Sequence, residues 1–216
     1  MKLIRQSVEF IGLNDPIQEL KKLERIGRVC YKSENRITED TYKEFLLRIV
    51  KNGHESVLEH INFTVKFITD RGVTHELVRH RLCSYSQEST RYCKYDKDVT
   101  FIIPVEFYST LGTETFIVKR DYIEFYKNQS ETLYNWLKIL FDISQSYSLL
   151  MQWCTAQFAR SILPNCLKTE IYMTTNLRQL KHIYKLRSSK FAHPQMADLM
   201  TQMFNLIPKN YMFLLG

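Results

Sequence analysis

The sequence has little glycine or proline and none of the compositional breaks that separate domains. Its 216 residues include 6 Gly and 5 Pro, with no low-complexity run, no Gly/Ser linker and no repeat of fixed period. We therefore expect a single domain over residues 1–216. Nowhere are about 18 uncharged apolar residues consecutive, and charge interrupts the N-terminal segment before an apolar stretch long enough for a secretory signal. Neither membrane insertion nor export by that route is expected.

Cysteine is also scarce. The five cysteines are an odd number without a CxxC pair, so neither a disulfide framework nor a common zinc spacing is visible. Reduced thiols, and hence a cytoplasmic protein, fit this pattern best. The cysteines are Cys30, Cys83, Cys93, Cys154 and Cys166.

The chain is rich in apolar residues and carries a net positive charge. Hydrophobic residues make up 44% and aromatic residues 13%, which is ample for a folded core. Thirty Lys and Arg against 23 Asp and Glu leave a formal charge of +7. This favours a polyanionic partner, either nucleic acid or a phosphorylated metabolite. The sequence has no GxGxxG and no Walker motif, so neither a Rossmann nor a P-loop mode of phosphate binding is indicated.

Periodicity predicts helices and strands without a regular βαβ alternation. Apolar residues at spacings of 3 and 4 predict a helix over 38–51, capped by Thr38 and stopped by Asn52-Gly53. Strict alternation predicts a strand over 61–68, ended by the turn 70–72. The other expected elements are a short helix at 73–81, a strand at 99–103 ended by Pro104, a helical stretch at 114–160 broken near Asn128, a strand at 167–175, a helix from the cap Asn176 to Arg187, and a helix at 196–207 stopped by Pro208.

This mixture predicts an α+β fold, with a mainly antiparallel twisted sheet flanked by long helices.

The segment Arg79–Tyr92 concentrates groups that bind phosphate. Three arginines and four serine or threonine hydroxyls fall within it, together with the amides of an expected loop. A guanidinium matches a phosphate with two parallel hydrogen bonds, and hydroxyl and backbone N–H groups complete the shell. From spacing alone, a solvated basic turn explains the segment equally well.

The helix ending at Arg187 turns that arginine inward. At 100° per residue, Arg187 lies about 20° from Leu180 and 40° from Ile183, on the apolar face. An inward arginine is expected to meet an anion, a carboxylate or a carbonyl, unless the helix frays and the side chain reaches water. Arg178 and His182, four residues apart, share another face and can contact one ligand together.

The pattern RHR-xx-S-xxxx-S-x-R, present as Arg79-His80-Arg81, Ser84, Ser89 and Arg91, resembles the signature of the flavin-dependent thymidylate synthases. The likeness extends over most of residues 54–187, through the segments 54–60, 159–164, 175–178 and 185–187. Such enzymes use reduced FAD, methylenetetrahydrofolate and NADPH to methylate dUMP to dTMP. They act as homotetramers whose sites are shared between subunits.

The resemblance also implies roles for individual residues. The implied FAD contacts are Ser56, Arg79, His80, Arg81, Gln87, Asn176, Arg178 and His182, with His54 bordering the flavin and the folate entrance. The implied dUMP contacts are Glu76, Arg79, Gln87, Glu88, Ser89, Thr90, Arg91, Arg160 and Arg187. Arg187 is the implied catalytic residue, because it would stabilise the ionised pyrimidine. Flavin N5 would supply the hydride, so no obligatory protein nucleophile is expected.

Four other interpretations compete with this one. A basic nucleic-acid-binding module is suggested by the net charge and by Tyr85, Tyr92 and Tyr95, which are available for stacking. A serine hydrolase with Ser89 as nucleophile and His80 as base lacks the GxSxG elbow. Cys83 and Cys93 are alternative nucleophiles. A metal site would draw on the group His54, Glu55, Glu59 and His60, but two histidines six apart without a third ligand are weak support.

Overall fold

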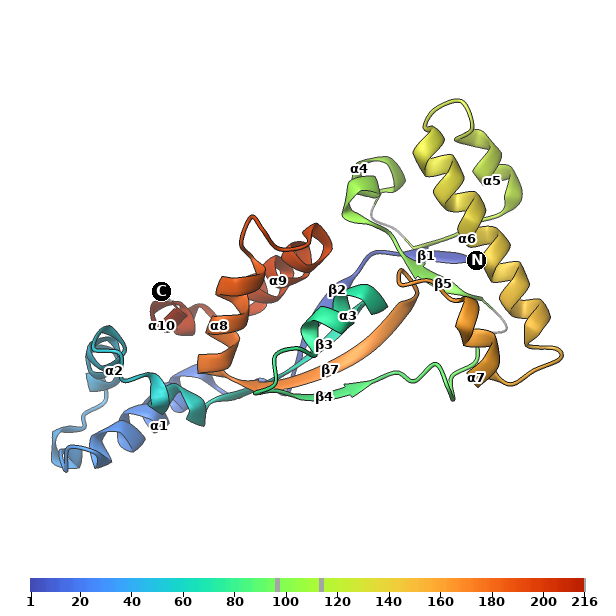
Figure 1. Ribbon diagram of the computed structural model, residues 1–216. Coiled ribbons are helices and arrows are strands. Elements are labelled where there is room, and N and C mark those ends of the chain that lie inside the picture. Colours follow the sequence, from blue (N-terminus) through green and yellow to red (C-terminus); the bar gives the residue numbers. More distant parts are fainter. Residues whose placement is uncertain (96–97, 113–114, 216) are drawn as a thin grey trace. The chain divides into compact units, whose positions relative to one another are not determined.

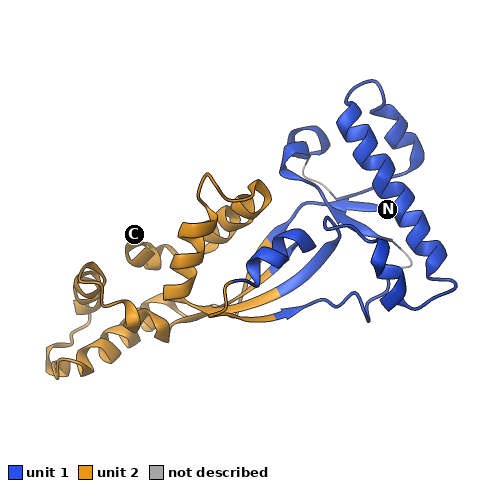
Figure 2. Cartoon of the chain, in the orientation of Figure 1, with its two compact units in different colours: residues 1–7, 67–79, 86–171 blue, residues 8–66, 80–85, 172–216 orange. Residues whose placement is uncertain are grey.

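The structure is a computed structural model that describes residues 1–95, 98–112 and 115–215. The chain forms two compact units, shown in Figure 2. Unit 1 comprises Met1–Ser7, Phe67–Arg79 and Ser86–Ile171, and unit 2 comprises Val8–Lys66, His80–Tyr85 and Tyr172–Gly216. The expectation of one domain over the whole chain remains a prediction. Among the described residues, no helix has the length and hydrophobicity that crossing a bilayer requires.

Two sheets organise the strands (Figure 1). The larger has the order β2-β3-β7-β4, with bounds β2 Ser7–Ile11, β3 Asn62–Asp70, β7 Lys168–Asn176 and β4 Ser84–Gln87. The smaller has the order β5-β1-β6, with bounds β5 Thr100–Ile102, β1 Lys2–Ile4 and β6 Phe116–Ile117. β1 pairs antiparallel with β6 and parallel with β5. The predicted α+β fold with mainly antiparallel sheets is confirmed, and the β1–β5 pair is a parallel exception.

The core of unit 1 lies between the small sheet and the longest helix. In α6 (Glu131–Leu150), Ser130 caps the first turn by accepting a hydrogen bond from the Leu133 amide. Leu133, Leu137 and Leu140 are buried at helical spacing, in one cluster with residues of the small sheet such as Leu3 and Phe101. Burial of this apolar stripe is what stabilises the helix in place.

The helical stretch expected over 114–160 is only partly confirmed, because α6 is long whereas the other helices in it are short and a strand interrupts it. The described part of this stretch contains β6, then α5 (Arg120–Phe125), and after α6 only the single turn α7 (Ala156–Ala159). The break near Asn128 is confirmed, because Asn128 lies between α5 and α6. Residues 113–114 lie outside the described residues. The remaining elements of unit 1 are α3 Arg71–Leu77, α4 Tyr108–Leu111 and the 3-10 turns η3 Val105–Phe107 and η4 Arg160–Ile162.

Unit 2 is largely helical. Its elements are α1 Pro16–Val29, η1 Glu34–Arg36, α2 Thr41–Lys51, η2 Glu55–His60, α8 Leu177–Arg187, α9 Pro194–Leu206, η5 Lys209–Tyr211 and α10 Met212–Leu215. α2 begins three residues later than predicted, because the Thr41 hydroxyl bonds the backbone of Thr38 in a turn before the helix. Its end at Asn52-Gly53 is confirmed, where Gly53 takes the positive φ of 76° that closes the helix. α9 begins two residues earlier than expected, with Pro194 in its first turn.

Two strands of the large sheet run directly into helices. Asp70, the last residue of β3, accepts a hydrogen bond from the Val73 amide at 2.6 Å and caps α3. Asn176, the last residue of β7, accepts one from the Gln179 amide at 2.8 Å and caps α8 as predicted. The expected turn at 70–72 is therefore a helix start, and α3 ends at Leu77 rather than at residue 81. These junctions carry the chain into the two motif segments that begin at Arg79 and Asn176.

Candidate active site

The part of the motif in unit 1 forms a loop, residues 88–93, directly after β4. The Glu88 amide donates to the Glu170 carbonyl at 2.9 Å, which ties the start of the loop to β7. The amides of Tyr92 and Cys93 both donate to the Ser89 carbonyl, at 3.1 and 2.9 Å. The backbone therefore turns tightly around Ser89, and the Arg91 amide lies 3.3 Å from the Ser89 hydroxyl oxygen.

Partly buried polar contacts hold this loop in place. The Glu88 carboxylate accepts one hydrogen bond from the Tyr95 hydroxyl at 2.5 Å and one from the Lys168 ammonium at 3.0 Å. Burial, and then the hydrogen bond to Glu88, raise the pKa of Tyr95 well above its usual value, so the phenol stays protonated as the donor. Gln87, just before the loop, donates its amide to Thr74 and Thr169. Glu88 and Gln87 thus face inward and fix the loop.

Two arginines meet at the 88–93 loop from different segments. Arg160, the first residue of η4, donates from its guanidinium to the Thr90 hydroxyl at 3.2 Å. The exposed Arg91 donates from Nε to the side chain of Gln157 in α7 at 3.3 Å. Arg91 and Arg160, which the resemblance assigns to the dUMP phosphate and ribose, thus lie at one loop with Thr90, which it places near the nucleotide. Guanidinium forks and hydroxyl groups in this arrangement are suited to a phosphate.

The part of the motif in unit 2 centres on His80 and Arg187. Arg187, the last residue of α8, donates from Nε to Nε2 of His80 at 3.0 Å. The predicted inward orientation of Arg187 is thus found, and one of its partners is the imidazole of His80. The His80 ring also packs edge-on against His182, with the ring centroids 6.4 Å apart.

This arrangement fixes the protonation state of His80. Burial, followed by the charges of Arg187 and His182, lowers the pKa of His80 to about 4. A guanidinium is always a donor, so Nε2 of His80 must be the acceptor, and the proton of the neutral ring sits on Nδ1. The neutral His80 ring therefore adds no positive charge beside Arg187, and the guanidinium carries the charge of this pair.

Tyr85 and Cys83 support the His80 segment. The Tyr85 hydroxyl donates to the His80 carbonyl at 3.2 Å, and burial, followed by its contact with Cys83, raises the pKa of Tyr85 well above its usual value. The Cys83 thiol donates to the Thr175 hydroxyl at 3.2 Å. Both side chains are partly buried structural contacts in this unit.

A pocket of about 740 Å³ lies beside α8 within unit 2. Of the residues expected at FAD, Asn176, Arg178 and His182 line it. The other lining residues were not expected from the sequence, and they are Glu55, Glu59, Leu82, Gln179, Lys181 and Lys185. We call this cavity the α8 pocket. It mixes cationic and amide donors with one exposed leucine, which fits a ligand that has both phosphates and a flat apolar ring.

Acidic residues of η2 organise the cations of the α8 pocket. Arg178 donates to Glu59 at 2.6 Å, and Lys181 donates to Glu55 at 3.0 Å. Glu55 and Glu59, considered above as metal ligands, are thus partners of cations. Within the described residues, no group of three His, Cys, Asp or Glu side chains is arranged to hold a metal ion.

The remaining predicted residues lie in the same two units. In unit 1, the exposed Arg79 follows α3, and its amide donates to the carbonyl of the half-buried Glu76. In unit 2, Arg81 and Ser56 are exposed and do not line the α8 pocket. His54 precedes η2, and its Nδ1 lies 2.9 Å from the Tyr31 hydroxyl.

Solved structures share the fold of this chain. The chain matches thymidylate synthase X (ThyX) from Helicobacter pylori, crystallised with FAD and dUMP, with a TM-score of 0.71 and 21% identity, covering 98% of this chain and 97% of that one. It also matches PolB from Streptomyces cacaoi, a UMP/dUMP methylase bound with 5-Br dUMP, with a TM-score of 0.71 and 20% identity, covering 95% and 91% of the two chains.

Sequence comparison then identifies the family. The family model described as thymidylate synthase complementing protein matches residues 15–211. The flavin-dependent thymidylate synthase of Pyrococcus furiosus is 34% identical over 188 residues, which are 85% of this chain and 69% of the relative. That of Clostridium tetani is 33% identical over 180 residues, 80% and 69% of the two chains. The chain belongs to the thymidylate synthase complementing protein family, and the resemblance noted at residues 79–91 is confirmed.

Proposed function

We propose that this protein is a flavin-dependent thymidylate synthase that methylates dUMP to dTMP. The observation that carries the proposal is the pairing of Arg187 with a neutral His80, in a chain of this family. A pyrimidine becomes more reactive at C5 when negative charge on its ring is stabilised. Arg187 keeps its full charge beside an uncharged imidazole, so it can supply that stabilisation.

The 88–93 loop is the proposed binding site for the dUMP phosphate and ribose. Arg91 and Arg160 supply the charge, while Ser89 and Thr90 add hydroxyl groups and Glu76 with Arg79 lies near the nucleotide. Gln87 and Glu88 act mainly by fixing the loop, because their side chains already bond Thr74, Thr169, Tyr95 and Lys168. A loop held in this way loses little conformational entropy when the nucleotide binds.

The α8 pocket is the proposed site of FAD. Lys185 offers positive charge for the pyrophosphate, Arg178 and Lys181 add N–H donors beside their partners Glu59 and Glu55, and Asn176, His182 and Leu82 line the same cavity. When bound, reduced FAD supplies the hydride that completes the methyl group. Ser56, Arg81 and His54 are outside this lining, and they act on FAD only if a second copy of the chain contributes them or the ligand extends beyond the pocket.

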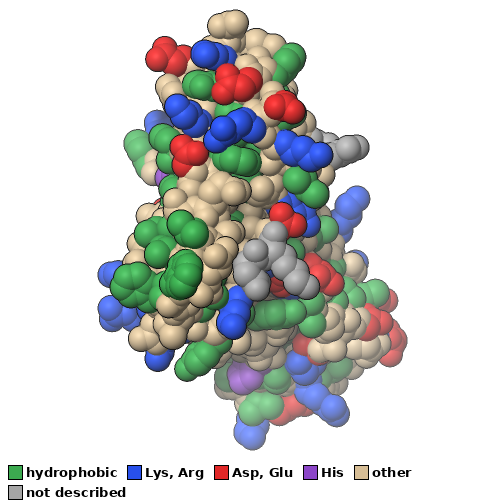
Figure 3. Space-filling model, turned by 90° about the vertical axis from the view of Figure 1, so that its right-hand side faces the viewer, with side chains coloured by type: hydrophobic (Ala, Val, Ile, Leu, Met, Phe, Trp, Pro, Cys, Tyr) green, Lys and Arg blue, Asp and Glu red, His purple; other side chains and the backbone are tan. Residues whose placement is uncertain are grey.

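Other parts of the proposal follow from the family. Methylenetetrahydrofolate is the proposed carbon donor, NADPH the reductant and the cytoplasm the location. A homotetramer with shared sites is supported by large hydrophobic side chains left exposed in this chain, among them Trp153 at 82% and Phe158 at 62%. Figure 3 shows several clusters of hydrophobic side chains, interspersed with charged ones, on the face that it displays. Exposed apolar area of this kind is typical of contact surfaces.

The test of this function is release of tritium from C5-labelled dUMP by the purified protein. We expect release and dTMP formation only when FAD, NADPH and methylenetetrahydrofolate are all present, and we expect dUMP to perturb the flavin absorption band. The Arg187→Gln variant should retain the flavin band and lose roughly a hundredfold or more in kcat, since one transition-state donor contributes that much.

Controls separate this function from its rivals. Cys83→Ser with Cys93→Ser should retain activity, because no thiol nucleophile is needed. Covalent dUMP attached to either cysteine or to Ser89, or a colourless protein that binds DNA and not FAD, would contradict the proposal.

A further inference from the structure

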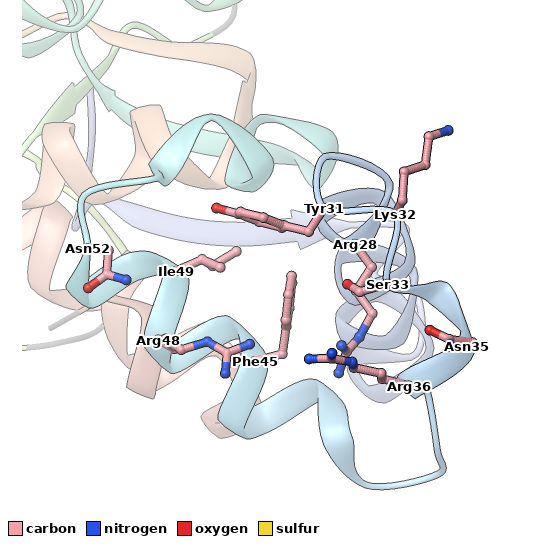
Figure 4. Close-up of a pocket in the computed structure, with 10 residues that line it drawn as sticks. All are labelled: Arg28, Tyr31, Lys32, Ser33, Asn35, Arg36, Phe45, Arg48, Ile49 and Asn52. Atoms are coloured by element: carbon pink, nitrogen blue, oxygen red, sulfur yellow. The ribbon is translucent and has the colours of Figure 1, made fainter.

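A second basic pocket lies between α1 and α2 in unit 2, lined by none of the residues assigned above (Figure 4). Its volume is about 450 Å³. Its lining contains four cationic residues and no carboxylate: Arg28, Tyr31, Lys32, Ser33, Asn35, Arg36, Phe45, Arg48, Ile49 and Asn52. We call it the α1–α2 pocket.

The guanidinium groups are arranged around one aromatic ring. The Cζ atoms of Arg28 and Arg48 lie 4.7 and 5.7 Å from the centroid of Phe45. In Figure 4, Arg48 lies on one side of the ring, and the guanidinium groups of Arg28 and Arg36 lie on the other. A ring of this kind holds guanidinium groups in place by cation–π attraction and so reduces the entropy that they lose on binding.

Most of the positive charge in the pocket is not compensated by the protein. The buried Arg28 is paired with Glu24, whose Oε1 accepts from both Nε and a terminal nitrogen at 2.8 and 2.7 Å. Within the described residues, Lys32, Arg36 and Arg48 have no carboxylate within 4.0 Å. Like charges grouped in this way repel one another, and an anion bound among them would relieve that repulsion.

The polar lining indicates which anion fits. Two exposed guanidinium forks, with Ser33, Asn35 and Asn52 beside them, offer many N–H and O–H donors, and the aliphatic lining is limited to Ile49. This composition favours phosphate oxygens over an apolar peptide or a lipid chain. The cavity exceeds what one phosphate needs, and the 56% exposed Tyr31 in its wall offers a ring for stacking.

We propose that the α1–α2 pocket binds the phosphate groups of a nucleotide, at a site additional to the dUMP and FAD sites. Arg36 and Arg48 bind the phosphate oxygens, Arg28 holds Phe45 in position, and Tyr31 faces the attached nucleoside. The Tyr31 hydroxyl is hydrogen-bonded to His54, which the resemblance places beside the flavin. A ligand in the pocket would therefore contact a residue that is bonded to His54. The ligand group that this site recognises is a diphosphate or a phosphomonoester. Either a nicotinamide dinucleotide or a nucleoside triphosphate can supply such a group.

The test uses the full chain with FAD bound and dUMP saturating, so that the α8 pocket and the 88–93 loop are both occupied. Inorganic pyrophosphate is titrated calorimetrically into the wild type, the Arg36→Gln/Arg48→Gln variant and the control Arg25→Gln/Lys51→Gln. The control removes two exposed cations of α1 and α2 that do not line the pocket. We expect the pocket variant to weaken pyrophosphate binding by roughly tenfold or more and the control by about twofold or less.

Titrations of the same variants with nucleotides identify the ligand. A loss of affinity in the pocket variant for NADP⁺ but not NAD⁺ identifies the 2′-phosphate, a loss for both identifies the dinucleotide diphosphate, and a loss for dTTP alone identifies a triphosphate effector.

Equal weakening in both double variants, or no pyrophosphate binding by the wild type, would overturn the proposal. Because all replaced side chains are exposed, unchanged melting temperatures are expected, and the Arg36→Lys/Arg48→Lys variant should show an intermediate loss. Pyrophosphate binding is read without flavin chemistry, so its failure is separate from failure of the proposed synthase activity.

Discussion

At the scale of single residues, the site depends on which groups carry charge. His80 lies between two arginines in the sequence, and this position suggests a protonated histidine or a contact with phosphate. In the structure its ring is buried and accepts a hydrogen bond from Arg187, which requires a neutral imidazole. The effect is to concentrate positive charge on Arg187 at the end of α8.

The low pKa of His80 predicts a defined loss of stability in acid. Between about pH 6.5 and pH 4 the unfolded chain binds a proton at this residue that the folded chain does not bind, so the free energy of unfolding falls as the pH is lowered through this range. Urea unfolding of the wild type and His80→Gln at several pH values should show that this contribution is lost in the variant. An identical pH dependence in both proteins would contradict the assignment.

NMR titration of the imidazole provides a direct check of the same point. In Arg187→Gln the pKa of His80 should rise but remain below its ordinary value, because burial is the larger cause of the shift.

At the scale of helices and strands, local signals were readable from the sequence and distant pairings were not. The helix from Leu177 to Arg187 was predicted with its cap, because Asn176 and the apolar spacing are adjacent in the chain. The short strand β4 was missed, since its residues are polar and the Glu88 amide that follows it bonds Glu170, 82 positions away in the chain. The same applies to Lys181 and Lys185, which received no role from the sequence and which the structure places in the α8 pocket.

The packing of α1 on α2 gives a prediction at this scale. A Cβ atom added to Gly27 would lie 2.7 Å from Cε1 of Phe45. Alanine in a helix interior normally stabilises by about 1 kcal/mol relative to glycine, but overpacking costs about 1–3 kcal/mol. We therefore expect Gly27→Ala to lower the free energy of unfolding, and Gly27→Ala with Phe45→Leu to recover part of the loss. The control Arg25→Ala, at an exposed position of α1, should be close to neutral. A clear gain in stability for Gly27→Ala would show that Phe45 moves aside freely.

At the scale of the whole molecule, the sequence predicted the family and the fold class but not the division into units. The motif Arg79–Arg91 is itself divided, with Arg79 and Ser86–Arg91 in unit 1 and His80–Tyr85 in unit 2. No linker composition marks this division, since the chain crosses between units within strands such as β3 and β7. Composition can reveal a boundary at a flexible linker, but not one inside regular structure.

Self-association gives the prediction at this scale. Trp153 follows α6 and is 82% exposed in the single chain, so we expect it to be covered in the proposed homotetramer. Replacing it with Glu should shift the sedimentation profile toward smaller species and reduce activity, because a buried unpaired charge opposes association. Gln152→Glu adds the same charge at the neighbouring exposed position and is the matched control. If both variants sediment like the wild type, Trp153 is not part of the interface.

The direct continuation of β3 into α3 and of β7 into α8 limits how this protein can change. Asp70 and Asn176 are both the last residue of a strand and the cap of the next helix, so no spare residue lies between the two elements. One inserted residue after Asn176 would rotate the downstream side chains by about 100° around the axis of α8 and turn Arg187 away from His80. A substitution at the site can therefore change activity by a small amount. An insertion or deletion at either strand–helix junction instead moves every site residue of the following helix together.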